Sequence, residues 1–311
     1  MKLRYLILIV LLLLGASVVF FATTHRLKVL VLLQKGKSYM NINNEVYNSV
    51  NLFKKYAGED LQVVVKEVKD EVEAKKFIDN LQPTFIISAI HKPVFEKLLN
   101  FYHNKYEKFI NIFPFYENSM VKNLNPSFED MSFEVVKFLK RKSISSVDIR
   151  CDNTHLTRLL LYHIRKNLKN NGIDVNKDSS FHLMVFNDVL RSEYEISNIV
   201  ASNKSINGII MSVYPFRFCE IYGEYINDFY AVFPRYFFTE KGKSFVERYK
   251  RVFKRYPNWP AVLVFDALSM IDKYGKEAFK IVKYSGVAGE YNFSESDNLF
   301  IISKFKDVKV K

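Results

Sequence analysis

Short apolar runs alternate with amphipathic stretches from residue 27 onwards, and this alternation restricts the possible folds of the chain more than any other feature. Leu27–Leu33 and Leu61–Val68 are rich in Val and Leu and predict buried strands. Glu71–Leu81 is charged, with apolar residues at helical spacing, and predicts a helix after the second strand. Strands separated by helices of about ten residues are typical of βαβ units, so we expect an α/β fold with parallel sheets flanked by helices.

The same pattern starts again after residue 125. Ser127 and Asp130 predict a capping box at the start of a helix. No Gly- or Ser-rich linker separates the halves, so we expect two α/β lobes with a cleft between them. The other predicted strands are Thr84–Ile87, Phe109–Phe113, Val147–Arg150, Phe181–Phe186, Gly208–Val213 and Phe229–Phe233. The other predicted helices are Glu45–Tyr56, Pro93–Phe101, Leu156–Leu168, Glu193–Ala201, Lys241–Tyr256 and Ala261–Tyr274.

Residues 1–26 predict a signal peptide or a transmembrane anchor, that is, an N-terminal hydrophobic helix ahead of the lobes. Lys2 and Arg4 precede the apolar run Tyr5–Ala22. As a helix this run would be about 27 Å long, enough to span the bilayer core. The cleavage site is weak and no Cys follows the run, which excludes a lipoprotein. Cleaved and uncleaved forms both place residues 27–311 in the periplasm or elsewhere outside the cytoplasm, and the uncleaved form would be anchored in the inner membrane.

No motif for catalysis, metal or nucleotide binding is present, so we expect no enzyme activity, no cofactor and no metal. The chain has 6 His and 2 Cys, without metal-ligand spacing or a nucleophile motif. Gly36-Lys37-Ser38 resembles the end of a P-loop, but Val31 stands where the first Gly is required. Cys151 and Cys219 form either one disulfide or two thiols.

The charge is strongly basic: 46 Lys and Arg against 33 Asp and Glu give a net charge of +13. Seven of these basic residues lie in Lys241–Arg255, beside the single acid Glu247. This run is either a patch for anionic lipid headgroups or an acidic partner, or the solvated face of an amphipathic helix. No groove-reading or base-stacking motif accompanies the charge, so we expect no nucleic-acid partner.

The carboxyl-terminal region resembles a known family. Phe245–Pro257, Ala261 and Phe265-Asp266-Ala267 are similar to the Phe…Tyr…Tyr-x-x-Pro…Tyr-Asp-Ala signature of leucine-binding-protein-like solute receptors. Ser285–Phe293 resembles the Gly-x-x-Gly-x-x-x-Phe turn of that family. The resemblance implies a two-lobed type I periplasmic-binding-protein-like fold for residues 27–311. Lobe one would comprise residues 27–125 and 239–292, and lobe two residues 126–238 and 293–311.

The resemblance also implies where a ligand would bind. The implied ligand-binding residues are Ser88, His91, Lys92, Phe115, Tyr116 and Tyr214. Amino-acid receptors of this family have serines after the third strand, where this chain has His91 and Lys92, and a cation at a helix start attracts an anion. Phe115 and Tyr116 are bulkier than the family's residues, and Tyr214 matches an aromatic residue of the second lobe.

We therefore expect an extracytoplasmic solute-binding protein that resembles the branched-chain amino acid receptors of ABC transporters. Its ligand would be small, anionic or aromatic, and its partner an ABC permease. The alternative is a membrane-anchored, degenerate form of the fold that acts as a protein-protein interaction or regulatory module, with a protein partner in the cell envelope. The bulk of Phe115 and Tyr116 and a short segment between Tyr214 and Phe229 favour this alternative.

Overall fold

The computed structural model describes residues 26–56, 61–102, 108–112, 121–125, 127–186, 189–201, 207–212, 229–293 and 299–304. The chain divides into two compact units, of which the first comprises Met1–Leu124 and Leu263–Ile281 and the second comprises Asn125–Val262 and Val282–Lys311. The helix α9 (Glu240–Phe253) belongs to the second unit, whereas the resemblance assigns these residues to lobe one. The lobe boundaries remain a prediction.

The first unit contains a five-stranded sheet in the order β2-β1-β3-β4-β5, with every neighbouring pair parallel. Its strands are β1 (Leu27–Gln34), β2 (Leu61–Val68), β3 (Phe85–Ala89), β4 (Phe109–Asn111) and β5 (Lys122–Asn123). Residues of β1 from Val29 to Gln34 are all buried, as expected for a central parallel strand.

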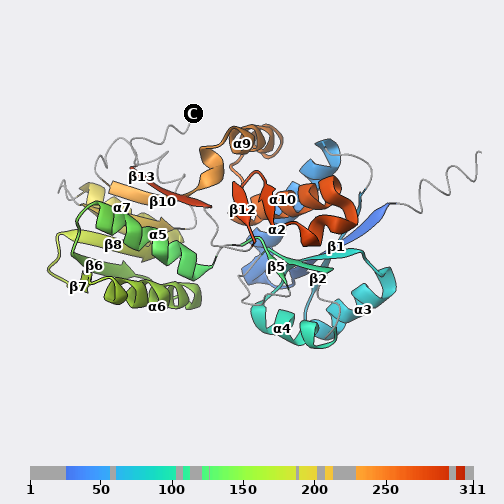
Figure 1. Cartoon of the computed structure of the whole chain (residues 1–311), viewed down its shortest axis with the longest axis horizontal. Coiled ribbons are helices and arrows are strands. Elements are labelled where there is room, and N and C mark those ends of the chain that lie inside the picture. The colour runs from blue at the N-terminus through green and yellow to red at the C-terminus, as the bar shows by residue number, and fades with distance from the viewer. Residues whose placement is uncertain are drawn as a thin grey trace, which may run out of the picture. The chain divides into compact units, whose positions relative to one another are not determined.

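Helices cover both faces of this sheet (Figure 1). They are η1 (Lys37–Tyr39), α2 (Met40–Tyr56), α3 (Glu71–Leu81) and α4 (Lys92–Asn100), with η4 (Gly275–Lys280) and most of α10 (Trp259–Tyr274) from later in the chain. Asp70 caps α3, because its side chain accepts from the Glu73 backbone N–H at 2.9 Å. On the α3 and α4 side, Ile78 and Phe95 pack against Leu30 in one apolar cluster.

The second unit contains a six-stranded sheet in the order β13-β10-β9-β8-β6-β7. Its strands are β6 (Ser146–Cys151), β7 (Asp174–Val175), β8 (Phe181–Phe186), β9 (Asn207–Ser212), β10 (Phe229–Pro234) and β13 (Phe300–Lys304). All pairs are parallel except β13, which runs antiparallel to β10 at the edge. Without β13, this sheet has the same strand order as the first, read from β7 to β10.

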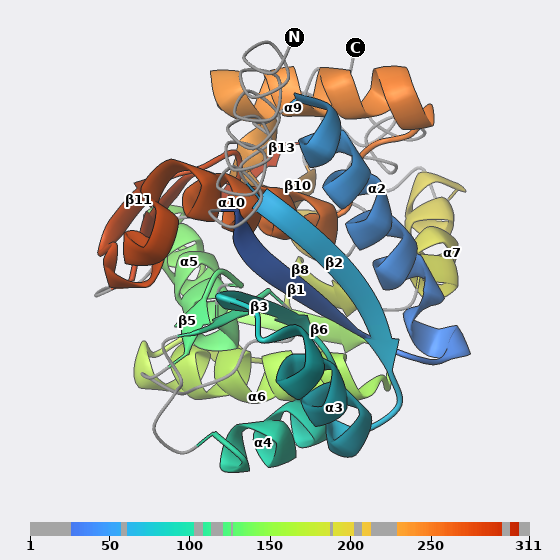
Figure 2. The same ribbon diagram turned by 90° about the vertical axis from the view of Figure 1, so that its right-hand side faces the viewer.

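The helices α5 (Phe128–Arg141) and α6 (His155–Asn170) cover one face of the second sheet, and α7 (Val189–Ala201) lies on the other (Figure 2). The capping box of α5 is confirmed, since Ser127 and Asp130 bond each other's backbone N–H. Val135 and Leu139 of α5 pack with Ile164 of α6. This unit also contains η3 (Arg235–Phe237), α9, and a hairpin of β11 (Lys283–Ser285) and β12 (Glu290–Asn292).

Several predicted boundaries were wrong for local physical reasons. The helix predicted to reach Tyr256 ends at Phe253, because Lys254 is left-handed with φ 57°. The strand predicted to end at Ile87 extends to Ala89, so Ser88 lies within β3 and not after it. Within the ranges that the structure describes, no helix has the length and apolar character that crossing a membrane requires. The expected hydrophobic helix at residues 1–26 lies almost wholly outside those ranges.

Candidate functional site

The winding of the first sheet defines one place for a ligand. The chain moves from β1 to β2 on one side and then to β3 on the other side of β1, so the order of the strands reverses between β1 and β3. Open parallel sheets bind ligands at the carboxyl ends of the strands beside such a reversal. Here the place lies between Gln34, which ends β1, and the connection from β3 to α4 at Ile90 and His91.

The Gln34 side chain joins three segments at this place. Its Nε2 donates to the backbone carbonyl oxygens of Val68 at 3.3 Å and Lys69 at 3.1 Å. Its Oε1 accepts from the His91 backbone N–H at 3.1 Å. Gln34 is only 6% exposed, so water does not compete for these bonds. Gln34 therefore fixes the start of α4 relative to β1 and to the end of β2.

The turn after β1 completes this edge of the sheet. Gly36 has φ 149°, which only glycine adopts readily, and it precedes η1. The Asn43 side chain, in the first turns of α2, donates from Nδ2 to the Gln34 carbonyl oxygen at 3.0 Å. Asn43 is 3% exposed, and its Oδ1 has no hydrogen-bond partner among the described residues. The segment that resembled a P-loop is thus a turn that packs beside Gln34.

Three polar side chains form a row across the first sheet near its carboxyl edge. Ser88 lies opposite Asn111, and Asn111 lies opposite Asn123. The Asn111 Nδ2 donates to the Asn123 Oδ1 at 3.0 Å. Ser88 is completely buried, and its hydroxyl has no hydrogen-bond partner in the part of the chain that the structure describes. A buried hydroxyl without a partner is costly, so Ser88 is a candidate donor to a bound ligand.

The two predicted cationic residues open α4. His91 is the N-cap, and its own side chain does not bond the helix backbone. Its ring is exposed and lies 6.2 Å from the Tyr39 ring, centroid to centroid. Burial raises the pKa of Tyr39 above its ordinary value of 10, where a phenol is already protonated and able to donate at neutral pH. The start of α4 therefore combines an uncapped helix end, an imidazole and a phenol.

Lys92 stands on the surface of α4. Its Nζ lies 3.9 Å from the Glu96 Oε1, one turn further along the helix, and both side chains are about half exposed. Exposed pairs of this kind contribute at most about 1 kcal/mol, so Lys92 could exchange this partner for an anionic ligand at little cost.

The other predicted ligand-binding residues, Phe115, Tyr116 and Tyr214, lie outside the described residues, as does Cys219. Cys151 ends β6 as an exposed, free thiol. Sequence reasoning missed Gln34 and Asn43. A polar residue at the end of an otherwise apolar strand, just before a Gly, is the signal that could have singled out Gln34. Asn43 offered no comparable signal, because Asn41, Asn44 and Glu45 around it are also polar.

The carboxyl edge of the second sheet carries a matching helix start. Thr154 caps α6, because its Oγ1 accepts from the Thr157 backbone N–H at 3.3 Å. Asp152 supports this cap by accepting from the Thr154 backbone N–H at 3.1 Å. The Thr154 side chain thus caps α6, whereas no side chain caps α4, whose Val94 backbone N–H donates to the His91 carbonyl oxygen at 3.0 Å.

Comparison with solved structures places this fold among transport proteins. A solute-binding protein of an ABC transporter from R. palustris, in complex with benzoate, has a TM-score of 0.62 and 12% identity, over 91% of this chain and 94% of that chain. A leucine-binding protein from Thermotoga maritima has a TM-score of 0.60 and 15% identity, over 89% and 94%. A branched-chain amino acid transporter substrate-binding protein from Streptococcus pneumoniae, in complex with isoleucine, has 0.60 and 12%, over 86% and 91%.

These similarities define the fold of the chain. It is the α/β fold of ABC-transporter solute-binding proteins, including leucine-binding proteins, and the predicted resemblance is confirmed at the level of the fold. No family model matches the sequence, and no curated protein does.

Proposed function

We propose that the protein is an extracytoplasmic solute-binding protein that delivers a small anionic or aromatic ligand to an ABC permease, and that it is not an enzyme. The observation that carries this proposal is the buried polar group at the strand-order reversal of the first sheet, with the unbonded Ser88 hydroxyl at its centre. Similar structures hold benzoate, 3,4-dihydroxybenzoate and isoleucine, which are all carboxylates.

The chemistry of this edge suits a carboxylate. The Ser88 hydroxyl would donate to one carboxylate oxygen, and the start of α4 would contribute the positive end of the helix dipole. His91 and Lys92 would add positive charge, and Tyr39 would add an aromatic face beside His91. Phe115, Tyr116 and Tyr214 remain proposed contacts for an apolar or aromatic part of the ligand.

The proposed location follows from the amino-terminal sequence. An apolar run ahead of the two units would either direct export and be removed, or hold the protein at the inner membrane. Both outcomes keep the ligand site on the outer side of that membrane, where a receptor for import operates.

The first test is thermal unfolding of the full chain in detergent against benzoate, 3,4-dihydroxybenzoate, leucine and isoleucine. A ligand at 100 times its dissociation constant adds about 2.7 kcal/mol to the free energy of unfolding, which raises the midpoint clearly. A response to one of these acids supports the proposal. A panel without any response would contradict the proposed ligand class and favour the interaction module.

Ser88→Ala separates a ligand role from a structural one. Because the hydroxyl is buried without a partner, its removal should leave the ligand-free protein as stable or more stable. The same change should weaken a carboxylate ligand by about 1–3 kcal/mol, measured by calorimetry. Ser38→Ala, at an exposed position, should alter neither quantity. Unchanged ligand affinity in Ser88→Ala would remove Ser88 from the site.

A further inference from the structure

The second sheet lacks a crossover helix that the first sheet has. In the first unit α3 links β2 to β3, and its residues Ala74 and Ile78 pack on Leu30 and Ile86. In the second unit the short turn of residues 176–180 links β7 to β8. The equivalent face of the second sheet therefore has no α3 counterpart.

Polar residues occupy the positions that α3 would cover. Asp148 of β6 lies opposite His182 of β8, in the same register as Leu30 opposite Ile86 in the first sheet. Arg150 lies two residues beyond Asp148 and so shares its face of β6. The apolar pair Leu30 and Ile86 of the first sheet thus corresponds to the polar pair Asp148 and His182 of the second sheet.

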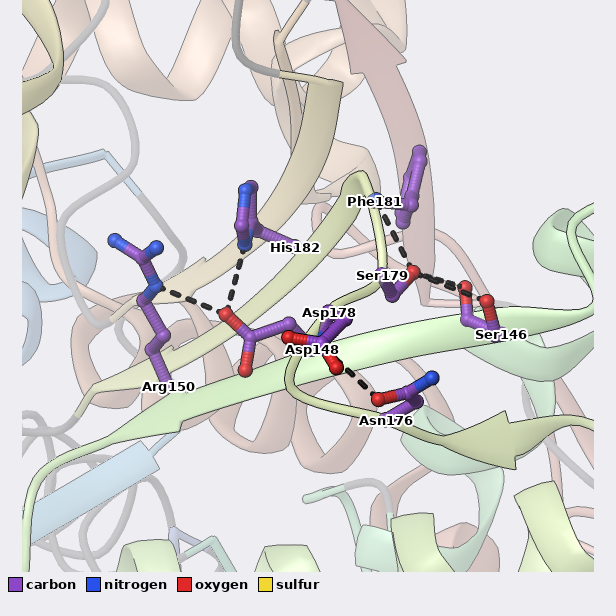
Figure 3. A network of polar contacts seen from close by, with 8 residues as sticks. All are labelled: Ser146, Asp148, Arg150, Asn176, Asp178, Ser179, Phe181 and His182. Atoms are coloured by element: carbon purple, nitrogen blue, oxygen red, sulfur yellow. Dashed lines mark hydrogen bonds and ion pairs between the residues drawn. The ribbon is translucent and has the colours of Figure 1, made fainter.

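One carboxylate oxygen of Asp148 contacts both Arg150 and His182 (Figure 3). The Asp148 Oδ2 accepts from the Arg150 Nε at 3.2 Å and lies 2.9 Å from the His182 Nδ1. The side chains of Asp148 and His182 are 13% and 15% exposed, and that of Arg150 is 42% exposed. In Figure 3, Arg150 and His182 project from the same side of Asp148, and their remaining nitrogens point away from the carboxylate. The structure records no other side-chain partner for either residue within its described ranges.

Hydrogen bonds fix the neighbouring turn of residues 176–180. The Ser179 Oγ donates to the Ser146 carbonyl oxygen at 2.8 Å and accepts from the Phe181 backbone N–H at 3.2 Å. The Asn176 Oδ1 accepts from the Asp178 backbone N–H at 3.0 Å (Figure 3). These bonds fix the start of β8, and hence the position of His182, before any ligand arrives.

We propose that Arg150 and His182, oriented by Asp148, bind a phosphate group. The Arg150 guanidinium offers its two terminal nitrogens, which match two phosphate oxygens. In the tautomer that donates Nδ1–H to Asp148, the His182 Nε2 accepts a hydrogen bond from a P–OH group. A phosphate monoester has a second pKa of about 6, so near that pH it still carries a P–OH that sulfate lacks, and the site distinguishes the two anions.

The proposed phosphate site shares no residue with the proposed solute site. Arg150 and His182 lie on β6 and β8 of the second unit, whereas Ser88, His91 and Lys92 belong to the first unit. The phosphate proposal therefore does not depend on the proposed function.

The test is calorimetric titration of the full chain with inorganic phosphate, glycerol 3-phosphate and sulfate at equal ionic strength and about pH 6.5, where both phosphates retain a P–OH on a substantial share of molecules. We expect both phosphates to bind and sulfate to bind at least about tenfold more weakly, since it cannot donate to His182. Tighter binding of glycerol 3-phosphate would assign the site to a phosphate monoester, and tighter binding of the inorganic ion to free phosphate. Equal affinities for sulfate and phosphate would overturn the proposal.

Variants locate the binding. Arg150→Gln should weaken phosphate at least about tenfold, because a charge-assisted pair of bonds is lost, and His182→Phe should remove the preference over sulfate. Arg248→Gln is the matched control, since Arg248 lies on α9 and its guanidinium bonds the Ser244 carbonyl oxygen and hydroxyl of the same helix. Wild-type affinity in Arg150→Gln, or an equal loss in Arg248→Gln, would refute the site. Unchanged thermal midpoints would show that each variant is folded.

Discussion

Buried polar residues carry most of what is specific to this chain. Gln34 and Ser88 lie within one sheet. Both side-chain polar atoms of Gln34 are hydrogen-bonded, whereas the Ser88 hydroxyl has no partner among the described residues. A buried amide with all its hydrogen bonds stabilises the fold, whereas a buried hydroxyl without a hydrogen bond lowers its stability. This contrast is why Ser88, and not Gln34, is the residue that we assign to a ligand.

Lys122 is a buried cation in the first unit. It is 7% exposed, donates from Nζ to the Ile281 carbonyl oxygen at 2.6 Å, and lies 5.7 Å from the centre of the Phe279 ring. Burial lowers the pKa of Lys122 from 10.5 to about 8. The folded protein therefore releases this proton at a lower pH than the unfolded chain does.

This difference predicts a pH dependence of stability. Between pH 8 and 10.5 the unfolded chain binds more protons at Lys122, so the free energy of unfolding gains a contribution that rises with pH. Measured by denaturant titration, wild type should gain stability relative to Lys122→Met across this interval. Lys108→Met, at an exposed position, should follow the wild-type profile. Parallel profiles for wild type and Lys122→Met would contradict the lowered pKa.

At the scale of elements, the basic helix α9 shows why its sequence pattern had two interpretations. Its apolar residues Phe245, Val246 and Tyr249 are buried, so the opposite face carries the charges in solvent. Some of these charges are already engaged locally. The Lys250 Nζ donates to the Tyr256 hydroxyl at 2.7 Å, and Lys241 donates to the Ser285 hydroxyl at 2.8 Å. The structure thus favours the solvated face of an amphipathic helix.

Gly242 allows the first turn of α9 to pack closely against the backbone of Tyr236. A Cβ at this position would lie 1.7 Å from the Tyr236 carbonyl oxygen, far inside contact distance. Gly→Ala inside a helix normally stabilises by about 1 kcal/mol. Here we expect Gly242→Ala to destabilise by at least about 1–3 kcal/mol, since backbone must move. Chemical denaturation followed by circular dichroism measures the change, with the exposed Lys243→Ala as control. A stabilised Gly242→Ala would disprove the close approach.

For the whole molecule, the repeated strand order is the main organising feature. Both sheets place five parallel strands in the same order, and the second adds the antiparallel β13 at its edge. The resemblance predicts a shortened segment between Tyr214 and Phe229, yet β10 still provides the fifth strand of this order. The short segment is therefore weak support for a degenerate fold. The difference between the sheets lies instead at the missing counterpart of α3.

The net charge of +13 predicts a salt dependence for the whole chain. Self-repulsion destabilises a compact, highly charged protein, and salt screens it over about 8–10 Å at 0.1–0.15 M. The thermal midpoint should therefore rise as sodium chloride increases from 10 to 150 mM. Betaine at equal osmolality serves as the uncharged control. A midpoint that falls with salt would mean that ion pairs, such as Arg191 with Glu195, outweigh the repulsion.

The local elements could be predicted from the sequence, since helix and strand periodicity and capping depend on residues close together in the chain. β2, α3 and β8 occupy the predicted ranges, and Ser127 caps α5 as expected. Short strands such as β5 and β7 were not predicted, because two residues carry no periodicity.

Only the tertiary structure decided which elements meet. Gln34 bonds His91 across 57 positions of sequence, and Asp148 meets His182 across 34. Strand pairing creates both contacts, and it depends on the whole set of buried surfaces and backbone hydrogen bonds, not on a local pattern. Ser88, His91 and Lys92 were therefore predicted only from the family resemblance, and the apolar periodicity gave no sign of the charged group on the second sheet.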